Sequence, residues 1–236
     1  MSYDIYTNSI DQLNVTDEKQ IINTINPHSY VTAKNDPLFE IALRDSDVLL
    51  PDGSGIVLAA KNIHRVRIQK IAGMDLHIHL LEQLNTKSGK CFYMGASQNT
   101  LDKIKERLTR EYPNITAEFY SPPFKPEFNA EDNAEIVQVV NDFQPDVLFV
   151  GMTAPKQEKW LYAHKNSLDF KVASSIGAVF DFYAGTVQRP SQFWIDLHLE
   201  WLPRLLKEPK RLWRRNFVST PLFLWDMLGY KIGIKK

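Results

Sequence analysis

The stretch Asp146-Val147-Leu148-Phe149-Val150-Gly151-Met152-Thr153-Ala154-Pro155-Lys156-Gln157-Glu158-Lys159-Trp160 indicates the fold class. Its first part is an apolar run that stops at Gly151, and its second part is polar and favours a helix. A strand without polar alternation is buried on both faces, as in a parallel sheet covered by helices. We therefore predict a central parallel strand whose carboxyl end leads into a loop and a helix N-terminus, where open α/β sheets bind ligands.

The same pattern of apolar run, small or polar turn and helix occurs four more times. The further candidate strands are 19–23, 47–50, 90–94 and 171–176. If the strands are parallel, their carboxyl ends gather at one edge of one sheet. We predict an α/β fold with a Rossmann-like, mostly parallel sheet over residues 1–190 and a helical C-terminal appendage over residues 191–236.

Length and composition place the chain among enzyme-sized α/β proteins. Its 236 residues carry no net charge and can bury a substantial core. Cys91 is the only cysteine and lies within a candidate strand, which predicts a packed thiol, no intramolecular disulfide and a reducing compartment. The sequence shows neither a long apolar span nor an N-terminal leader, so we expect a cytoplasmic protein that does not cross a membrane.

Charged and aromatic residues are concentrated in the C-terminal segment. Residues 194–236 hold nine Lys or Arg against four acids, and four of the five tryptophans. Basic residues beside large aromatics suit a helix at a lipid interface, which predicts peripheral contact with the inner face of the cell membrane. A helical pair that packs its tryptophans on the core is an equal alternative. Both interpretations hold if one face of the helices contacts the core and another contacts the membrane. Nucleic acid is not an expected partner, because no motif for it occurs.

Three arginines in this segment are candidates for binding phosphate. Arg204, Arg211 and Arg214 would share one face of a continuous helix, although Pro209 is expected to divide that helix in two. A guanidinium group matches phosphate oxygens bidentately and does not lose its charge. A solvated basic face is the alternative.

Four motifs, taken in order, carry a resemblance to a known family. They are Pro51-Asp52-Gly53-Ser54-Gly55-Ile56-Val57, the Gly151–Trp160 part of the opening stretch, Ile176-Gly177-Ala178-Val179-Phe180-Asp181-Phe182-Tyr183-Ala184-Gly185-Thr186 and Leu199-Glu200-Trp201-Leu202-Pro203-Arg204-Leu205. From about Ile21 to Trp225 the chain resembles the WecG/TagA/CpsF family of bacterial glycosyltransferases. The resemblance implies an inverting enzyme without metal or cofactor. Such an enzyme moves a sugar, commonly N-acetylmannosamine or its uronic acid, from a UDP-sugar donor to an undecaprenyl-diphosphate-linked acceptor at the cytoplasmic membrane face.

Asp52 is the expected catalytic base. Inverting transfer needs a group that takes the proton from the acceptor hydroxyl, and a positioned carboxylate contributes roughly 10²–10⁴-fold. Asp52 follows a predicted strand, and the resemblance assigns the base to this Pro-Asp-Gly motif. The alternative is that Asp52 caps the helix beginning near Gly55.

The resemblance also assigns polar residues that bind the substrates. Thr24 and Asn26 match its Thr-x-Asn element, and alternatively this pair ends a strand and caps a helix from Pro27. Gln157 should reach the donor or the acceptor hydroxyl, the alternative being a solvated residue in a first helical turn. Lys70 stands where several members have Arg, which keeps the charge but removes the planar fork.

Turn residues at the strand ends are expected to contact the nucleotide, because glycine lets a ligand approach the backbone. These residues are Gly95, Ser97, Gly151 and Gly177. Asp181 is a candidate for hydrogen bonds to the ribose or uracil, the alternative being a buried acid bridged to Arg189. The resemblance implies that the three arginines neutralise the departing diphosphate when the appendage docks, which lipid binding would promote.

Some features point to other interpretations. Asp45-Ser46-Asp47 spells the Asp-x-Asp pattern by which many other nucleotide-sugar transferases hold a metal ion, but it precedes a predicted strand, so we expect no metal there. His198 stands where glycine usually precedes Leu-Glu-Trp. A non-catalytic nucleotide-sugar-binding module with a basic docking tail is the alternative function. The sequence identifies neither the donor sugar nor the oligomeric state, and a homo-oligomer is left open.

Overall fold

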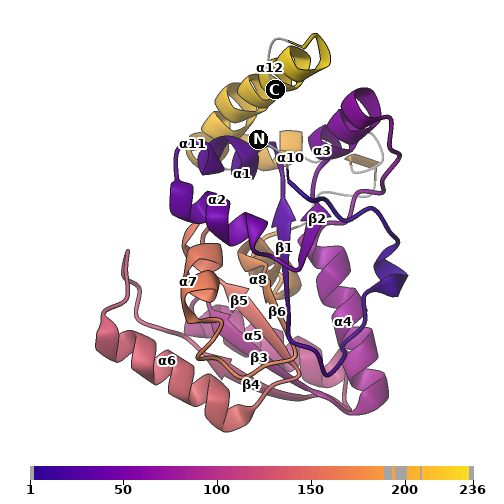
Figure 1. Ribbon diagram of the computed structural model, residues 1–236. Helices are drawn as coiled ribbons and strands as arrows, with labels where there is room; N and C mark the ends of the chain where they lie inside the picture. Colours follow the sequence, from indigo (N-terminus) through magenta and orange to yellow (C-terminus); the bar gives the residue numbers. More distant parts are fainter. Residues whose placement is uncertain (1–2, 189–192, 195–200, 208, 234–236) are drawn as a thin grey trace.

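The protein is built on one sheet of six parallel strands (Figure 1). The computed structural model describes residues 3–188, 193–194, 201–207 and 209–233. Across the sheet the strands are β2 (Val48–Pro51), β1 (Gln20–Ile25), β6 (Val172–Ser175), β5 (Val147–Gly151), β3 (Lys90–Gly95) and β4 (Thr116–Tyr120). The α/β class is confirmed, and so are the five predicted strands.

The sequence pattern misses the sixth strand, β4. Its residues, Thr116-Ala117-Glu118-Phe119-Tyr120, alternate polar and apolar side chains and form no apolar run. β4 pairs with β3 at the edge of the sheet. A strand at an edge is not buried on both faces, so it lacks the continuous apolar pattern that marks the central strands.

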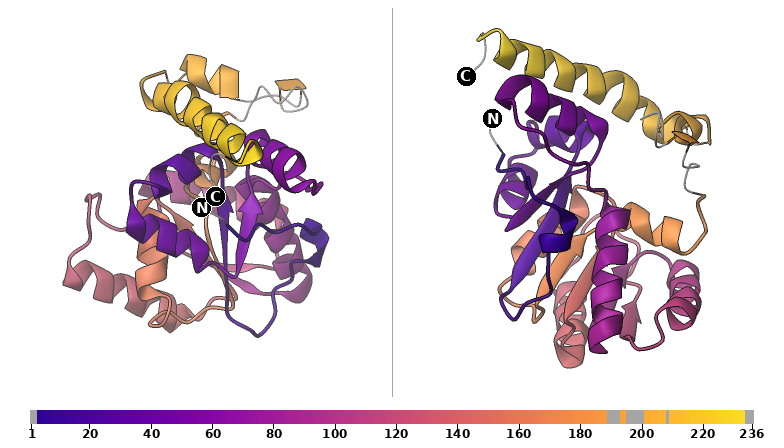
Figure 2. Two further views of the ribbon diagram at one scale, coloured as in Figure 1. Left: turned by 45° about the horizontal axis from the view of Figure 1, so that its top comes forward. Right: turned by 90° about the vertical axis from the view of Figure 1, so that its right-hand side faces the viewer.

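Helices cover both faces of the sheet, because crossovers of one hand that run in opposite directions along the strand order place their helices on opposite faces. One face carries α1 (Pro27–Ala33), α2 (Pro37–Arg44), α6 (Ala130–Phe143) and α7 (Lys156–His164). The other face carries α4 (Gly73–Lys87), α5 (Gln98–Glu111) and α8 (Gly177–Tyr183) (Figure 1, Figure 2). A short 3-10 helix, η1 (Ile10–Gln12), precedes β1, and α3 (Ser54–Ala59) with the π-helical turn η2 (Ala60–His64) follows β2.

Alternate residues of β3 and β5 point into two different cores. Tyr93 and Phe149 pack with α4, α5 and α8, whereas Phe92 and Leu148 pack with α6 and α7. Every residue of β5 is buried, which accounts for the apolar run that begins the opening stretch. Cys91 faces the first of these cores and is fully buried, which confirms the packed thiol.

Four helical segments end the described chain. They are α10 (Trp201–Lys207), α11 (Pro209–Arg214), the π-helical turn η3 (Arg215–Ser219) and α12 (Thr220–Lys231). A new helix begins at Pro209, as the proline predicts. α12 packs on α1 and α3, so it lies across the end of the sheet toward which β1 and β2 run (Figure 1). None of the helices described combines the length and the apolar character needed to span a bilayer.

The contact between α12 and α1 has an apolar centre and a polar end. Phe223 is buried, and its ring packs edge-on against that of Tyr30 with 5.2 Å between the centroids. Asp226 is buried one turn further on, where it pairs with Lys34 and accepts a hydrogen bond from Tyr30 Oη at 3.4 Å. The last helix is thereby anchored to the first βα unit of the chain.

The tryptophans of the C-terminal helices do not fill this contact. Trp201, Trp213 and Trp225 are 37%, 49% and 70% exposed, whereas Phe223 and Leu212 are buried. The alternative in which the segment packs its tryptophans on the core is therefore wrong for these three residues. Different faces of the C-terminal helices meet the core and the solvent.

Candidate active site

The crossover directions single out the middle of the carboxyl edge of the sheet. From β3 the chain crosses to β4, and from β5 it crosses in the opposite direction to β6. β3 and β5 are neighbours, so this is the switch point at which open α/β sheets bind ligands. Gly95 and Gly151 are paired in register there, and Ala96 N donates a hydrogen bond to Gly151 O at 2.9 Å.

Close contacts within the protein require the three glycines at this edge. At Gly95, φ is +120° and an added Cβ would lie 2.3 Å from Gly151 O. At Gly151 an added Cβ would lie 2.3 Å from Phe180 Cε2, and at Gly177 it would lie 1.8 Å from Met152 O. Each glycine thus has a packing reason, and its contact with a nucleotide stays a prediction.

Ser97 and Asp181 have local structural roles and remain accessible. Ser97 is the N-cap of α5, where its Oγ accepts a hydrogen bond from Thr100 N at 3.3 Å. Asp181 lies on α8, and its Oδ1 accepts a hydrogen bond from Thr186 Oγ1 at 3.2 Å. Ser97 is exposed and Asp181 is partly exposed. The alternative partner of Asp181, Arg189, lies outside the described residues.

A second group of predicted site residues meets at the ends of β1 and β2. Asp52 directly follows β2, and its N–H donates a hydrogen bond to Ile25 O of β1 at 2.9 Å. Thr24 is paired in register with Leu50, two residues before Asp52. The N-cap position of α3 is Gly53, one residue after Asp52. The Asp52 side chain is partly exposed at the edge of the sheet.

Asn26 and Lys70 flank this group. Asn26 is the N-cap of α1, and its Oδ1 accepts hydrogen bonds from two backbone N–H groups of the first turn, each at 3.0 Å. The capping interpretation of Asn26 is confirmed, and its contact with a sugar stays a prediction. Lys70 precedes Ile71, whose N–H donates a hydrogen bond to Pro51 O at 3.0 Å. The Lys70 backbone therefore lies beside the end of β2.

Gln157 ties together the loops that follow β5 and β6. Its side chain is buried in the first turn of α7, so the interpretation as a solvated residue is wrong. Oε1 accepts hydrogen bonds from Met152 N at 3.2 Å and Gly177 N at 3.1 Å. Nε2 donates a hydrogen bond to Glu158 Oε1 at 2.9 Å. This connection lies between the glycines of the switch point and the group around Asp52.

The C-terminal helices reach the Asp52 end of the edge at the start of α1. His28 Nδ1 and Ser219 Oγ are hydrogen-bonded at 2.8 Å. Burial, together with the positive charges of Arg215 and Arg214, lowers the pKa of His28 from its ordinary value of 6.5. Arg214 is exposed on α11. Three predictions fall outside the described part of the chain, namely those on the side chains of Arg204 and Arg211 and on His198.

Comparison with known proteins decides the family. The family model described as "Glycosyl transferase WecG/TagA/CpsF family" matches residues 1–236. The chain belongs to this family. A relative from Bacillus spizizenii, named N-acetylglucosaminyldiphosphoundecaprenol N-acetyl-beta-D-mannosaminyltransferase, is 33% identical over 210 residues, which cover 89% of this chain and 79% of the relative. Proteins of the same name from Bacillus subtilis and Staphylococcus aureus are 30% and 28% identical, covering 88% and 91% of this chain and 78% and 82% of their own. The protein is a glycosyltransferase.

In this WecG/TagA/CpsF family member the Asp-x-Asp sequence lies at the amino end of the sheet. Asp47 immediately precedes β2, and its Oδ2 accepts a hydrogen bond from Ile21 N at 2.7 Å. Asp45 pairs with Lys165. Over the described residues, no group of three or more His, Cys, Asp or Glu side chains is placed to hold a metal ion. Both carboxylates have structural partners and lie at the opposite end of β2 from Asp52.

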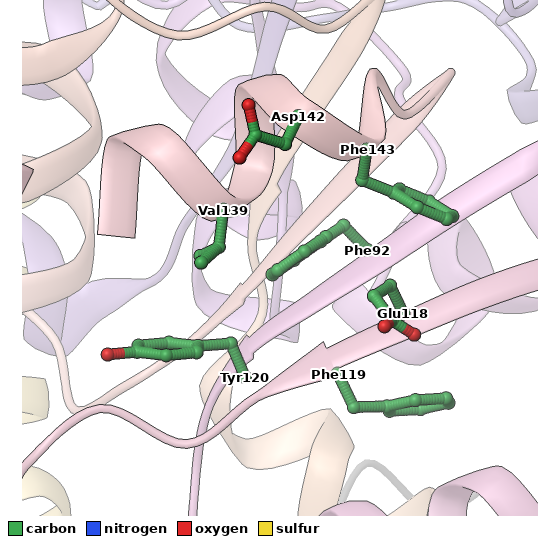
Figure 3. A pocket seen from close by; sticks show the side chains of 7 residues that line it. All are labelled: Phe92, Glu118, Phe119, Tyr120, Val139, Asp142 and Phe143. Carbon is green, nitrogen blue, oxygen red and sulfur yellow. The ribbon is translucent and has the colours of Figure 1, made fainter. Parts of the chain in front are cut away.

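An open pocket lies away from the proposed site, between α6 and the edge strand β4 (Figure 3). Its volume is about 370 Å³, and its lining residues are Phe92, Glu118, Phe119, Tyr120, Val139, Asp142 and Phe143. β4 and β2 are the two edge strands, so the width of the sheet separates this pocket from Asp52. None of the predicted site residues lines it.

Two residues near the site escape sequence reasoning. Glu158 is buried, and this burial raises its pKa to about 7. The sequence signal for its burial is its spacing three residues before Leu161, which places both on one face of α7. His28 carries no such signal, because its partner Ser219 comes from the far end of the chain.

Proposed function

We propose that this glycosyltransferase moves an N-acetylmannosamine-type sugar from a UDP-sugar to an undecaprenyl-diphosphate-linked saccharide, with inversion and without a metal ion, in the synthesis of a cell-surface polysaccharide. The observation that supports it is the position of Asp52 beside Thr24 at the carboxyl ends of β1 and β2. The chain that carries this arrangement has relatives named as mannosaminyltransferases of a GlcNAc-diphosphoundecaprenol.

In this proposal the donor lies extended along the carboxyl edge. β1 and β6 separate β2 from β5, and neighbouring strands are about 4.8 Å apart, so Asp52 and Gly151 are separated by roughly 14 Å across the sheet. A nucleotide over Gly95 and Gly151 directs its diphosphate past the loops that Gln157 connects. The sugar then reaches Asp52, with the acceptor hydroxyl on the side of the anomeric carbon opposite to UDP.

Asp52 takes the proton of the acceptor hydroxyl as the new glycosidic bond forms and the bond to UDP breaks. Its carboxylate is partly exposed at the edge, where an acceptor can approach it. Thr24, Asn26 and Lys70 surround the same strand ends and orient the sugar. This division of roles assigns proton transfer to one residue and positioning to the others.

The departing diphosphate is neutralised by fixed arginines. A guanidinium group presents parallel donors that match phosphate oxygens and needs no metal ion. Arg214 lies near the start of α1, where burial, Arg215 and Arg214, in this order, lower the pKa of His28. In the proposal Arg204 and Arg211 add to this charge when the appendage is docked.

The exposed face of the C-terminal helices contacts the membrane surface that carries the acceptor. Trp225 and Leu228 of α12 and its C-cap residue Ile232 follow helical spacing and are exposed, whereas Phe223 and Asp226 on another face are buried. A helix with aromatic and aliphatic side chains on one face and basic residues nearby suits the interface of an anionic bilayer. The protein would therefore act at the inner face of the cell membrane.

The transferase test measures release of UDP from a panel of UDP-sugars with a short-chain lipid-diphosphate-GlcNAc acceptor. We compare the wild type with Asp52→Asn, which keeps the size of the side chain and removes the base. Loss of the base should lower turnover roughly 10²–10⁴-fold and leave UDP binding near its wild-type value. The donor that supports acceptor-dependent release identifies the sugar.

Asp45→Asn is the matched control, because Asp45 belongs to the Asp-x-Asp sequence and lies at the other end of the sheet. It should keep wild-type turnover, and a chelator should leave the rate unchanged. Loss of activity with the chelator would contradict the metal-free proposal. Nucleotide binding by the wild type without UDP release from any donor would favour a binding module.

The membrane test measures co-sedimentation of the full chain with vesicles. Trp225→Ala should weaken binding to vesicles that contain anionic lipid, while Phe124→Ala, another exposed aromatic outside the C-terminal helices, should not. Equal binding by the two variants would show that the exposed face of α12 is not the contact.

A further inference from the structure

Glu158 is buried against the sheet directly beside Gln157. α7 packs on β5 and β6, and its residue Leu161 lies in one core with Val150. Glu158 precedes Leu161 by three residues and therefore also points toward the sheet. Ser175 is paired in register with Val150, so its hydroxyl faces the same space. Among the described residues, Glu158 Oε2 and Ser175 Oγ are buried without a hydrogen-bond partner.

The Gln157 amide has two ends with opposite requirements. Its oxygen faces the N–H groups of Met152 and Gly177, at 3.2 Å and 3.1 Å. A reversed amide would set its NH₂ group against these two partly buried donors and deprive them of this acceptor, which is costly. The nitrogen end needs an acceptor on the other side, and Glu158 Oε1 provides it at 2.9 Å.

We propose that Glu158 is a positioning residue, which holds the Gln157 amide in the one orientation that connects the loops after β5 and β6. For what these loops bind, the inference rests on the proposed function, because they border the path assigned to the donor diphosphate. For the hydrogen bonds themselves it does not. Glu158 does not touch the substrate and acts through Gln157.

The two loops approach each other so closely that small changes in Gln157 are transmitted to both. A Cβ added to Gly177 would lie 2.6 Å from Gln157 Oε1 and 1.8 Å from Met152 O. The backbone at these points is already in close contact, and Gly177 has no side chain that could adjust. The orientation of one amide thus decides whether both loop N–H groups are satisfied.

The ionisation of Glu158 sets the strength of its hydrogen bond with Gln157. Burial raises its pKa to about 7, partly offset by the hydrogen bonds from Gln157 and from the backbone N–H of Glu158. The strands under it, β5 and β6, contain no charged residue. The charged groups between α7 and the ends of α2 are paired with each other, as Lys159 with Asp36 and Lys165 with Asp45. A carboxylate accepts a stronger hydrogen bond than a neutral acid, so this hydrogen bond strengthens as the pH rises through 7.

The test follows the backbone amide signals of Met152 and Gly177 in the full chain by NMR, together with the KM for the UDP-sugar, from about pH 5.5 to 8.5. In the wild type both signals should titrate with a midpoint near pH 7, to which burial raises the pKa of Glu158. The KM should fall about fivefold over the same range, the difference between a neutral and a charge-assisted hydrogen bond.

Two variants of Glu158 separate positioning from a merely structural role. Glu158→Gln supplies a neutral acceptor at every pH, so its KM and amide signals should not depend on pH and should match the wild type at low pH. Glu158→Ala removes the acceptor and should have a higher KM than Glu158→Gln. The neutral acceptor of the Gln variant thus partly restores the affinity for the UDP-sugar. Glu106→Gln, which changes an exposed glutamate on α5, should keep the wild-type titration.

A pH dependence that Glu158→Gln leaves unchanged would overturn the inference. Wild-type signals of Met152 and Gly177 that do not move between about pH 6 and 8 would also overturn it. This outcome is measured on the wild type alone, so it does not depend on whether a variant folds. Titrating amide signals in a chain without transferase activity at any pH would support the positioning role and count against the proposed function alone.

Discussion

The contact between α12 and α1 predicts opposite outcomes for two neighbouring aromatic residues. Phe223→Ala should release α12 from the body of the protein, whereas Trp225→Ala should leave it docked. Both residues are aromatic and lie two positions apart on one helix, so their replacement by Ala changes helix propensity similarly at a similar distance from the chain end. They differ in what their rings touch, because Phe223 packs on Tyr30 and Trp225 faces solvent.

The size of the difference follows from burial. Phe223 is 1% exposed, and truncating a buried Phe to Ala costs about 3–5 kcal/mol. Since about 1.4 kcal/mol corresponds to a factor of ten, the equilibrium constant for release of α12 from the body of the protein should rise roughly 10²- to 10⁴-fold. Trp225 is 70% exposed, and its truncation should change stability by less than about 0.5 kcal/mol.

Hydrogen exchange of the backbone amides of residues 220–231, followed by mass spectrometry, measures this opening directly. Phe223→Ala should exchange at the rate of an undocked helix, while amides of β5 keep their protection because that strand is buried in the sheet. Trp225→Ala should exchange like the wild type. If both variants exchange alike, the docking described for α12 is not what protects this helix.

Other predictions concern stability and its pH dependence. Gly151→Ala places a Cβ 2.3 Å from the ring of Phe180 and should lower the free energy of unfolding by about 1–3 kcal/mol, measurable as a lower denaturant midpoint. Glu158 has a pKa of about 7 in the folded protein against 4.5 in the unfolded chain, so the folded state binds more protons between these values. Stability should therefore fall as the pH rises from 4.5 to 7, by about 3 kcal/mol, and Glu158→Gln should remove this slope in thermal melts. His28 has a lowered pKa, so the unfolded chain binds its proton first and the contact with Ser219 should weaken as the pH falls below 6.5; His28→Asn should abolish that loss in hydrogen exchange of α12.

The central strands could be predicted because burial on both faces restricts the residue types at each position. β5 is buried at every position, and only apolar residues and glycine occupy it. The edge strand β4 has no such constraint, since it is paired with a neighbouring strand on one side only. Its alternating polar and apolar residues fit a half-buried strand but form no apolar run, so a search for apolar runs misses it, and the pairing with β3 identifies it.

The site was predictable where a residue's role depends on its own chain neighbours. Asn26 stands before Pro27, and its capping of α1 follows from that local order. For Asp52 the local order allowed a cap as well as a base, and the helix that follows has Gly53 at its N-cap position. For Gln157 the local order was misleading, because the first turn of a helix is usually solvated, and here it lies against two loops.

The sequence by itself determined the succession of strands, turns and helices, because these depend on residues a few positions apart. It also determined that the strand ends carry Asp52, Thr24 and the glycines, since each follows an apolar run. Only the tertiary structure decided which distant groups meet. Tyr30 and Asp226 are separated by 196 positions, and Met152 and Gly177 share one amide oxygen although they lie on different loops. Such contacts depend on how the layers pack, and no periodicity in the chain records them.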